Sequence, residues 1–384
     1  MKLLYFYPEF PLQASQGNSI RVIALLDYFK SRGHQVDFVC EAPENKQGEM
    51  LEELKKSDLV SNCYFLRNYQ KKKHKLGYLF QISIPNLLHG RMRQFYRVKP
   101  GQQKDFNRIL QDKHYDLILI SYACWSGLIE DNPFTGKAQL WLDTHDFLTA
   151  QFQSTRRFDL GKSMETEIKL LGLFDKILVI SPEEQYVFSQ FIKKPIEVVT
   201  HSIPNASKYI SESIDYDFIF VGSDNQHNIQ SIQWFFNHVY PLLPKTARFI
   251  IIGKITDFVA EYPNVTKVRF APSLQVYYQK AKIALCPMVS GTGLKIKVVE
   301  ALSYGLPVVC QPRSIDGLWN KSENGCLVAN EPELFASHCI QLLNDEPLYN
   351  YHCEQSRTYF KNHHDTQKIY QELDRIFENY EKET

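Results

Sequence analysis

The chain has 384 residues, about two to three times the usual size of a single domain, so we expect two domains. Its 44 Lys and Arg residues nearly balance its 43 Asp and Glu residues, which excludes a protein whose whole surface binds nucleic acid. Hydrophobic residues make up 44%, as in a folded globular protein, and the eight scattered cysteines without a C-x-x-C pair favour reduced thiols over a disulfide scaffold.

The first half of the chain alternates strand-length apolar runs with a helical pattern. Residues 2–7 predict a strand, residues 20–29 a helix, and residues 36–40 a second strand. Such alternation predicts a parallel sheet with helical crossovers. Further strands are predicted at residues 116–121, 139–143 and 176–180.

Neither a leader nor a membrane span is expected. The apolar run at the N-terminus is interrupted by Pro8, so it is too short for the apolar core of a signal peptide. No window approaches eighteen uninterrupted apolar residues. We therefore expect a cytoplasmic protein.

A second α/β series begins near residue 215, after a Pro- and Ser-containing linker at residues 193–213. Its predicted strands are residues 217–221, 247–252, 265–268, 283–286 and 307–310. Its predicted helices are residues 228–240, 295–304, 331–343, 347–361 and 365–381. We expect an N-terminal domain at residues 1–200, a C-terminal domain at 201–362, and a final helix at 363–384 that packs back on the N-terminal domain.

The most informative segment is a glycine-containing loop that leads from a strand into a helix. Gly291 and Gly293 let the backbone approach a phosphate closely, and the helix that follows offers free N–H donors. Lys295 in the first turn opposes the helix dipole unless an anion is bound, and Glu300 could accept hydrogen bonds from a ribose. The alternative is a plain glycine-rich turn with a surface lysine.

This segment resembles a known motif. The run Gly-Thr-Gly-Leu-Lys at 291–295, with Glu-Ala-Leu at 300–302 and Gly-Leu-Pro-Val-Val at 305–309, is similar to the nucleotide-sugar motif of retaining GT-B glycosyltransferases of family 4 (glycosyl transferases group 1). Weaker matches extend along most of the chain, at residues 32–36, 145–146, 179–183 and 220–223.

The resemblance implies an α/β protein of GT-B architecture, with two Rossmann-like doubly wound domains facing a central crevice. It implies a retaining glycosyltransferase of the hexosyltransferase type that needs neither a metal nor a cofactor. The donor would be a UDP-, GDP- or dTDP-linked sugar, and the acceptor a glycan, a lipid-linked molecule or another group. The setting would be the synthesis of cell-surface polysaccharide or glycoconjugates.

The resemblance also assigns roles to residues. His145 would contact the donor sugar or its phosphate, Lys295 would neutralise the leaving phosphate, and Glu300 would bind the ribose hydroxyls. The positions carried over as donor-binding are Gly17, Gly222, Ser223, Gly291, Thr292, Gly293, Leu294, Lys295 and Glu300. His145 has a second interpretation, as a loop brace held by Asp143 or Asp146. No second His or Cys stands at ligand spacing from it, so no metal site is expected.

The chain departs from the family at two places. Thr292 stands where the family often has a first glutamate, and residues 223–228 contain neither the Arg nor the Lys that many members have. Lys295 would then be the main cation, helped by Lys297 or Arg313. These departures motivate an alternative function, a catalytically idle GT-B relative that binds nucleotide sugar or supports a partner glycosyltransferase.

A basic segment lies in the first half. Residues 67–104 contain ten Lys and Arg residues but no Asp or Glu, which suits an anionic membrane surface or a phosphorylated acceptor. The basic residues are Arg67, Lys71, Lys72, Lys73, Lys75, Arg91, Arg93, Arg97, Lys99 and Lys104, and the aromatic residues between them are Tyr69, Tyr78, Phe80, Phe95 and Tyr96. We expect peripheral contact with the inner face of the membrane and no nucleic acid; the alternative is a solvated face.

Overall fold

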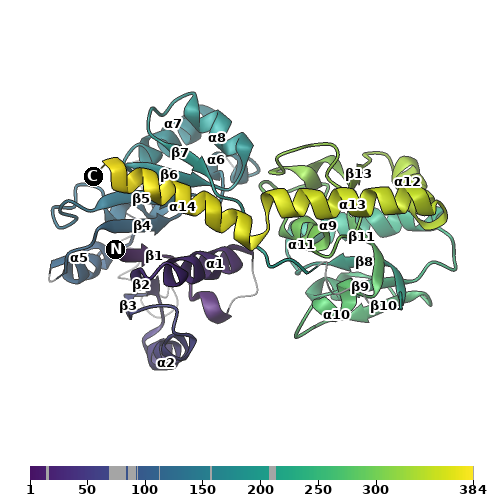
Figure 1. The fold of residues 1–384 in the computed structure, drawn as a ribbon, viewed down its shortest axis with the longest axis horizontal. Helices are drawn as coiled ribbons and strands as arrows, with labels where there is room; N and C mark the ends of the chain where they lie inside the picture. The colour runs from purple at the N-terminus through teal and green to yellow at the C-terminus, as the bar shows by residue number, and fades with distance from the viewer. Residues whose placement is uncertain are drawn as a thin grey trace. The chain divides into compact units, whose positions relative to one another are not determined.

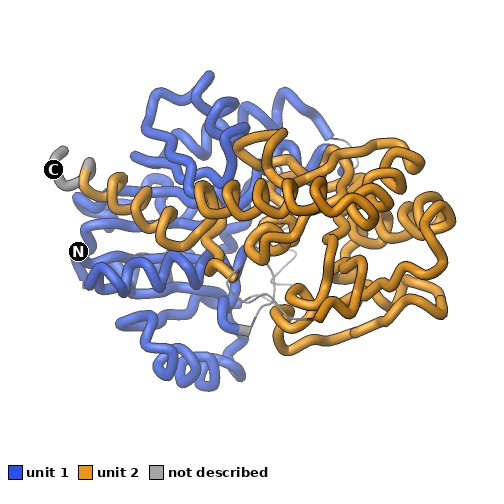
Figure 2. Tube along the Cα trace, turned by 45° about the vertical axis from the view of Figure 1, so that its right-hand side comes forward, with its two compact units in different colours: residues 1–199 blue, residues 200–384 orange. Residues whose placement is uncertain are grey.

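The chain folds into two compact units, each with its own sheet (Figures 1 and 2). The computed structural model describes residues 1–13, 17–68, 84, 92, 94–111, 113–155, 158–206 and 213–383. Unit 1 spans Met1–Val199, and unit 2 spans Thr200–Thr384. The packing of the last helix on the N-terminal half stays a prediction.

Unit 1 is built on a seven-stranded parallel sheet with the order β3-β2-β1-β4-β5-β6-β7. Its strands are β1 (Lys2–Phe6), β2 (Gln35–Glu41), β3 (Asn62–Leu66), β4 (Leu117–Ser121), β5 (Gln139–Asp143), β6 (Lys176–Val179) and β7 (Ile196–Val198). The α-helices described in this unit are α1 (Gly17–Ser31), α2 (Gln47–Ser57), α5 (Gln102–Gln111), α6 (Leu148–Gln151), α7 (Leu160–Leu171) and α8 (Pro182–Ser189). The central strand β4 is buried at every position, which explains its nearly continuous apolar sequence.

Unit 2 is built on a six-stranded parallel sheet with the order β10-β9-β8-β11-β12-β13. Its strands are β8 (Tyr216–Val221), β9 (Phe249–Ile252), β10 (Val265–Val268), β11 (Ala281–Cys286), β12 (Val308–Cys310) and β13 (Cys326–Val328). Its described α-helices are α9 (Gln226–Trp234), α10 (Gln275–Tyr278), α11 (Ile296–Ser303), α12 (Pro332–Asn344), α13 (Glu346–His363) and α14 (Thr366–Glu383). The helix predicted at 228–240 is α9 followed by a π-helical turn at Phe235–Val239.

The strand order reverses direction once in each sheet, between β1 and β4 in unit 1 and between β8 and β11 in unit 2. All strands in a parallel sheet end at the same edge, and ligands bind beyond that edge where the order reverses. The loops after β4 and β11, together with those after β1 and β8, are therefore the places to search for a site in each unit.

The apolar runs predict most strands to within a few residues, but they miss three edge or terminal strands. β3 is partly exposed, and β7 and β13 have only three residues each, too few for a periodic pattern. β7 falls inside the segment predicted as a linker, and the two units divide directly after it.

One part of the basic segment differs from the expectation. Phe95 is fully buried in the core of unit 1, so its proposed place on an exposed aromatic surface is wrong. Arg67 and Lys99 form ion pairs with Asp105 (2.6 Å) and Glu41 (2.7 Å). Lys71, Lys72, Lys73, Lys75, Arg91, Arg93, Tyr69, Tyr78 and Phe80 lie outside the described residues.

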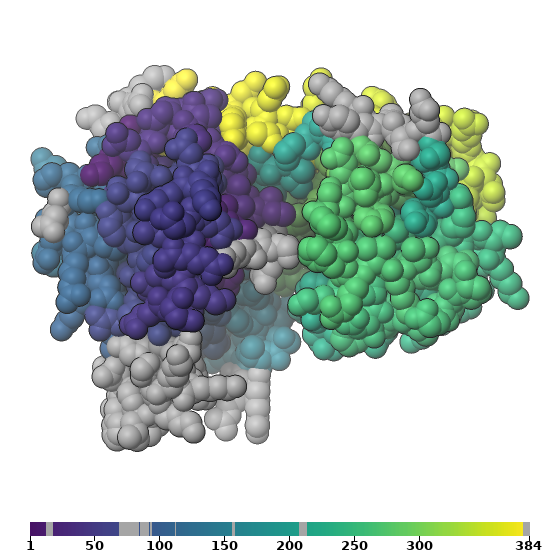
Figure 3. Space-filling model, turned by 90° about the horizontal axis from the view of Figure 1, so that it is seen from below, coloured from purple at the N-terminus to yellow at the C-terminus, as the bar shows by residue number. Residues whose placement is uncertain are grey.

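In the space-filling view, the green part of the chain that includes β10 and α10 forms much of the visible surface of unit 2 (Figure 3). Phe270, two residues after the end of β10, is 80% exposed, so an aromatic ring is accessible near this end of the strand. In the described part of the chain, we find no helix with the length and apolar character that a membrane span requires.

Candidate functional site

The glycine loop of unit 2 follows β11 and ends at the start of α11. Gly291 (φ 98°) and Gly293 (φ 72°) both have left-handed backbone conformations that side chains other than glycine rarely adopt. Lys295 is the N-cap of α11 with an extended backbone (φ −90°, ψ 98°), one position before the first helical turn in which the sequence placed it. The loop can therefore turn its backbone and the first N–H groups of α11 toward a ligand.

Lys295 is a buried cation with carbonyl partners. Its side chain is 8% exposed as a residue, and Nζ donates to the carbonyl oxygens of Gly293 (2.6 Å), Thr292 (3.1 Å) and Gly291 (3.4 Å). No ion pair of Lys295 occurs among the residues that the structure describes. Burial lowers the pKa of Lys295 to about 8, so the group is still mostly protonated at neutral pH. Asp316 offsets this effect in part, but it forms no ion pair with Lys295 in the described part of the chain, so the ammonium group is suited to bind an anion.

Lys297 ties the glycine loop to the loop after β8. Its Nζ donates to Asn228 Oδ1 (2.6 Å) and lies 4.9 Å from the centroid of the Phe220 ring, and burial lowers its pKa. Asn228 in turn donates to the carbonyl oxygen of Ser223 (3.1 Å). The two loops beside the order reversal of this sheet are therefore held together.

His227 is a site residue that the sequence analysis missed. It lies in the first turn of α9, is exposed, and its Nδ1 is 2.9 Å from Ser290 Oγ in the glycine loop. Ser290 Oγ donates to Gln230 Oε1 (2.8 Å), so Ser290 accepts a hydrogen bond from Nδ1–H of His227. A Cβ atom added at Gly291 would lie 3.4 Å from the His227 ring, so the ring packs against the glycine backbone.

Glu300 lies in the second turn of α11 and is half-buried. Burial raises its pKa to about 7, although a hydrogen bond from the Tyr278 hydroxyl favours the charged form. Tyr278 itself stacks on Tyr304 at 4.9 Å, which fixes its hydroxyl beside the carboxylate. Glu300 is therefore an anchored carboxylate that changes charge near neutral pH.

The other predicted positions of unit 2 differ in accessibility. Gly222 is buried, and a Cβ there would lie 2.9 Å from the Phe220 ring. Ser223 is exposed, and Thr292 is half-exposed. Leu294 is only 8% exposed, which makes its side chain a packing residue. Of the two predicted helper cations, the structure brings Lys297 to the loop, whereas the Arg313 guanidinium lies 3.5 Å from Asp316.

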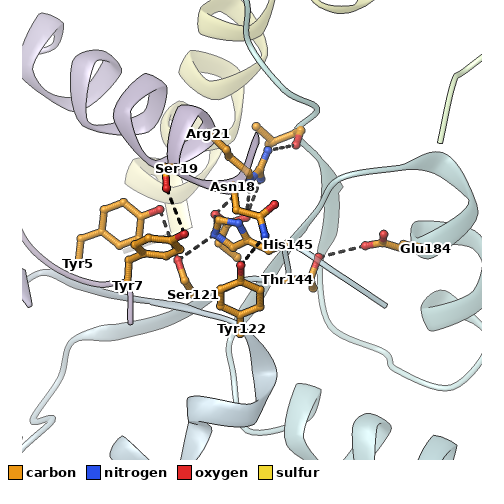
Figure 4. Close-up of polar contacts among 12 residues, drawn as sticks. Tyr5, Tyr7, Asn18, Ser19, Arg21, Ser121, Tyr122, Thr144, His145 and Glu184 are labelled. Atoms are coloured by element: carbon orange, nitrogen blue, oxygen red, sulfur yellow. Dashed lines mark hydrogen bonds and ion pairs between the residues drawn. The ribbon is translucent and has the colours of Figure 1, made fainter. Parts of the chain in front are cut away.

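His145 of unit 1 lies in a buried polar cluster (Figure 4). Its Nε2 is 2.9 Å from Asp143 Oδ2 and 3.0 Å from Ser121 Oγ, and its ring stacks on Tyr122 at 4.6 Å. The expected loop brace through Asp143 is therefore present. Nδ1 is buried and has no hydrogen-bond partner among the described residues, so only Nε2 takes part in the brace.

Asp143, the last residue of β5, is held in turn by Arg21 of α1. The guanidinium donates to Asp143 Oδ1 at 2.6 Å and 2.9 Å, and also to the carbonyl oxygen of Val199 (2.5 Å). Both side chains are buried, yet the charge of Arg21 and the hydrogen bond with His145 keep the pKa of Asp143 well below its usual range. The aspartate is therefore ionised at neutral pH and stabilises a proton on Nε2 of His145.

Two residues beside this cluster have backbone conformations that are uncommon outside glycine. Tyr122 (φ 65°) and His145 (φ 58°) follow neighbouring strands, β4 and β5. Asn18 Nδ2 donates to the Tyr122 hydroxyl (2.6 Å), and Gly17, predicted as donor-binding, begins α1 just before it. Left-handed residues at strand ends are frequent in functional sites, which favours a binding role for this cluster.

Among the residues that the structure describes, no group of three or more His, Cys, Asp or Glu side chains is arranged to hold a metal ion.

Part of the chain matches a known family model. Residues 215–345 match the family model described as glycosyl transferases group 1. An uncharacterized 44.6 kDa protein in the cps region of Klebsiella pneumoniae is 21% identical over 88% of this chain and 90% of its own length. These comparisons support a group 1 glycosyltransferase.

Solved structures share the fold over the whole chain. Sucrose-phosphate synthase from Thermosynechococcus elongatus matches at a TM-score of 0.71 and 14% identity, covering 100% of both chains. Anabaena HepE in complex with UDP matches at 0.70 and 14%, covering 99% of this chain and 100% of HepE. TarM matches at 0.72 and 11%, covering 98% of both. The predictions of a glycosyltransferase and of two Rossmann-like units in a GT-B type chain are confirmed.

The buried pair of Arg21 and Asp143 gives a stability prediction. Arg21→Met leaves an ionised carboxylate buried beside His145, so we expect unit 1 to lose about 3–5 kcal/mol of unfolding free energy. Urea unfolding measures this loss, and hydrogen exchange of the β5 amides assigns it to unit 1.

Arg32→Met, which removes an exposed arginine just after α1, is the matched control and should change the unfolding free energy by no more than about 0.5 kcal/mol. The double variant Arg21→Met/Asp143→Leu should recover part of the loss, because no buried charge remains. An Arg21→Met protein as stable as the control would show that the pair does not stabilise unit 1.

Proposed function

We propose that the protein is a retaining, metal-independent glycosyltransferase. It transfers a sugar from a nucleotide-sugar donor to a glycan, lipid-linked or other acceptor during the synthesis of cell-surface polysaccharide or glycoconjugates. The observation that carries the proposal is the glycine loop after β11, where Lys295 is a buried cation without an ion-pair partner among the described residues.

The proposed chemistry uses the loop to stabilise the leaving group. When the bond between the sugar and the diphosphate breaks, its electron pair stays on the diphosphate and negative charge grows there. Lys295 and the N–H groups at the start of α11 are held in place before the reaction, so they stabilise this growing charge more than the ground state. The reaction then needs neither a metal nor a cofactor. Glu300 is proposed to bind the ribose hydroxyls.

The comparisons support a choice of first donor. HepE has been crystallised with UDP, with UDP and glucose, and with UDP-glucose. We therefore propose a UDP-linked sugar as the donor, ahead of GDP- or dTDP-linked sugars. The Klebsiella relative in a cps region supports a role in surface polysaccharide synthesis.

A binding screen followed by a turnover assay tests the proposal. UDP, GDP, dTDP and their sugar conjugates are added separately, and we expect one of these nucleotides to raise the melting temperature of the protein. Slow hydrolysis of the matching nucleotide sugar without acceptor is expected to release the nucleotide diphosphate. Binding without any turnover would instead favour the idle relative that Thr292 suggests. No binding at all would contradict both the transferase and an idle relative that binds nucleotide sugar.

The same assay tests His145, whose free Nδ1 is proposed to contact the donor sugar or its phosphate. His145→Ala should keep the nucleotide affinity of the wild type, since the nucleotide is proposed to bind unit 2, but should lose about 100-fold in turnover. His114→Ala, which removes an exposed histidine of unit 1, is the control. Equal turnover of both variants would leave His145 with only its bracing role.

The pKa values of the two donor-site residues predict a pH optimum for binding. Lys295 loses its positive charge as the pH rises through about 8, and Glu300 loses its negative charge as the pH falls through about 7. Affinity for UDP-glucose should therefore be highest between these values and fall on both sides. UDP-glucose is the better probe because its phosphates, unlike the terminal phosphate of UDP, do not titrate near neutral pH.

Two variants separate the limbs of this profile, measured by calorimetry. Lys295→Ala should remove the alkaline limb, and Glu300→Gln, which imitates the protonated acid, should remove the acidic limb. A wild-type affinity that stays constant from about pH 6 to about pH 9 would contradict the assigned roles.

We also propose peripheral contact with an anionic membrane through the basic segment 67–104. Vesicles with anionic lipid should sediment the protein at low salt and release it at high salt, because each nearby basic residue contributes about 1 kcal/mol. Replacing Lys71, Lys72 and Lys73 by Gln should weaken sedimentation. The control replaces three exposed lysines elsewhere, Lys162, Lys169 and Lys245. Recovery in the supernatant under every condition would return the segment to a solvated face.

A further inference from the structure

We propose that His227 is a second donor to the leaving diphosphate and contacts it through Nε2. This inference rests on the proposed function, since it names a residue of the same donor site. Neither the sequence motif nor the comparisons assign any role to this histidine.

The hydrogen bonds of His227 fix the orientation of its ring. Nδ1–H of His227 donates to Ser290 Oγ (2.9 Å), and the Ser290 proton is used in its bond to Gln230 (2.8 Å). The ring is thereby fixed against the backbone of Gly291, with its Cγ 3.4 Å from the place of a Cβ there. Nε2 has no partner among the described residues, and the side chain is exposed. The ring is therefore fixed beside the glycine loop, with Nε2 left open to a ligand in that loop.

Few positively charged groups are available at the proposed donor site. A diphosphate carries more than one negative charge, and Lys295 alone does not balance it. Lys297 is engaged by Asn228 and the Phe220 ring, and Arg313 pairs with Asp316. Residues 222–226 contain no Lys or Arg, so His227 is the first basic side chain after β8.

The proposed contact requires no proton transfer. The electron pair of the broken bond stays on the diphosphate oxygen, and Nε2–H of protonated His227 donates a hydrogen bond to a phosphate oxygen. Hydrogen bonds between charged partners are roughly twice as strong as neutral ones, so the contact strengthens as charge grows on the leaving group. His227 would thus act as a catalytic residue beside Lys295.

Two isosteric substitutions separate this role from a structural one. His227→Asn keeps a donor near the position of Nδ1, so it can still bind Ser290, but it has no group at the position of Nε2. His227→Gln does the reverse. If the residue only braces the loop, Asn should behave as wild type; if it binds the diphosphate, Gln should be the better substitute.

The experiment measures the dissociation constants of UDP and UMP for the full-length wild type and these variants. We expect His227→Asn and His227→Ala to weaken UDP binding about tenfold and UMP binding clearly less, because UMP lacks the second phosphate. His227→Arg, which keeps a cation, should stay within about threefold of wild type for UDP. His238→Ala, at another exposed histidine of unit 2, is the control and should change neither constant.

Each outcome is informative. If the wild type binds none of UDP, GDP and dTDP, the proposed function fails, and this inference fails with it. If the wild type binds one of them but His227→Asn binds it equally well, only the inference is overturned and the donor site stands. Melting temperatures of the unliganded variants verify that each variant is folded, and His227→Asn carries the test if His227→Ala does not fold.

Discussion

Parallel strand pairing is the constraint on which both candidate sites depend. Every strand of a parallel sheet ends at the same edge, so the loops that follow the strands are collected there. In each unit the strand order reverses once, and at such a point the crossover connections of a doubly wound sheet leave toward opposite faces. The His145 cluster and the Lys295 loop both lie beside such a reversal. The fold therefore determines where a ligand can bind in each unit, and the loop residues determine which ligand it is.

The two sites treat buried charge in opposite ways. In unit 1, the charge of Asp143 is balanced by Arg21 at 2.6 Å, so the pair can hold His145 without an external partner. In unit 2, the described hydrogen-bond partners of the Lys295 ammonium group are carbonyl oxygens, and Asp316 acts on it only at longer range. Burying an ion without a counter-ion is unfavourable and lowers its pKa, which is the direction found for Lys295. Unit 1 thus pairs its buried Asp143 with Arg21, whereas Lys295 of unit 2 has no ion pair among the described residues.

A feature can be predicted from the sequence when the residues that form it lie close together in the chain. The glycine loop and Lys295 lie within five residues, so local spacing indicates them. The pair of Arg21 and Asp143 is separated by 122 residues and the contact of His227 with Ser290 by 63, and only the strand order brings them together. The prediction of an exposed Phe95 is wrong for a related reason. Nothing in a basic segment indicates which of its aromatic rings lies in the core. His227 lies in the segment where the family pattern expects Arg and Lys, so the pattern does not indicate a role for a histidine there.

Backbone strain helps to decide between the two interpretations of His145. Left-handed conformations at Tyr122 and His145 cost about 1–3 kcal/mol each unless the surroundings hold them. The stacking of the two rings and the bonds to Asp143 and Ser121 supply that support. Nδ1 of His145 is buried without a partner among the described residues, as are Nδ1 of His352 and Nε2 of His364 outside the candidate sites. The strained backbone and these contacts therefore fix the ring in one orientation, in which Nδ1 is the nitrogen that the brace does not use.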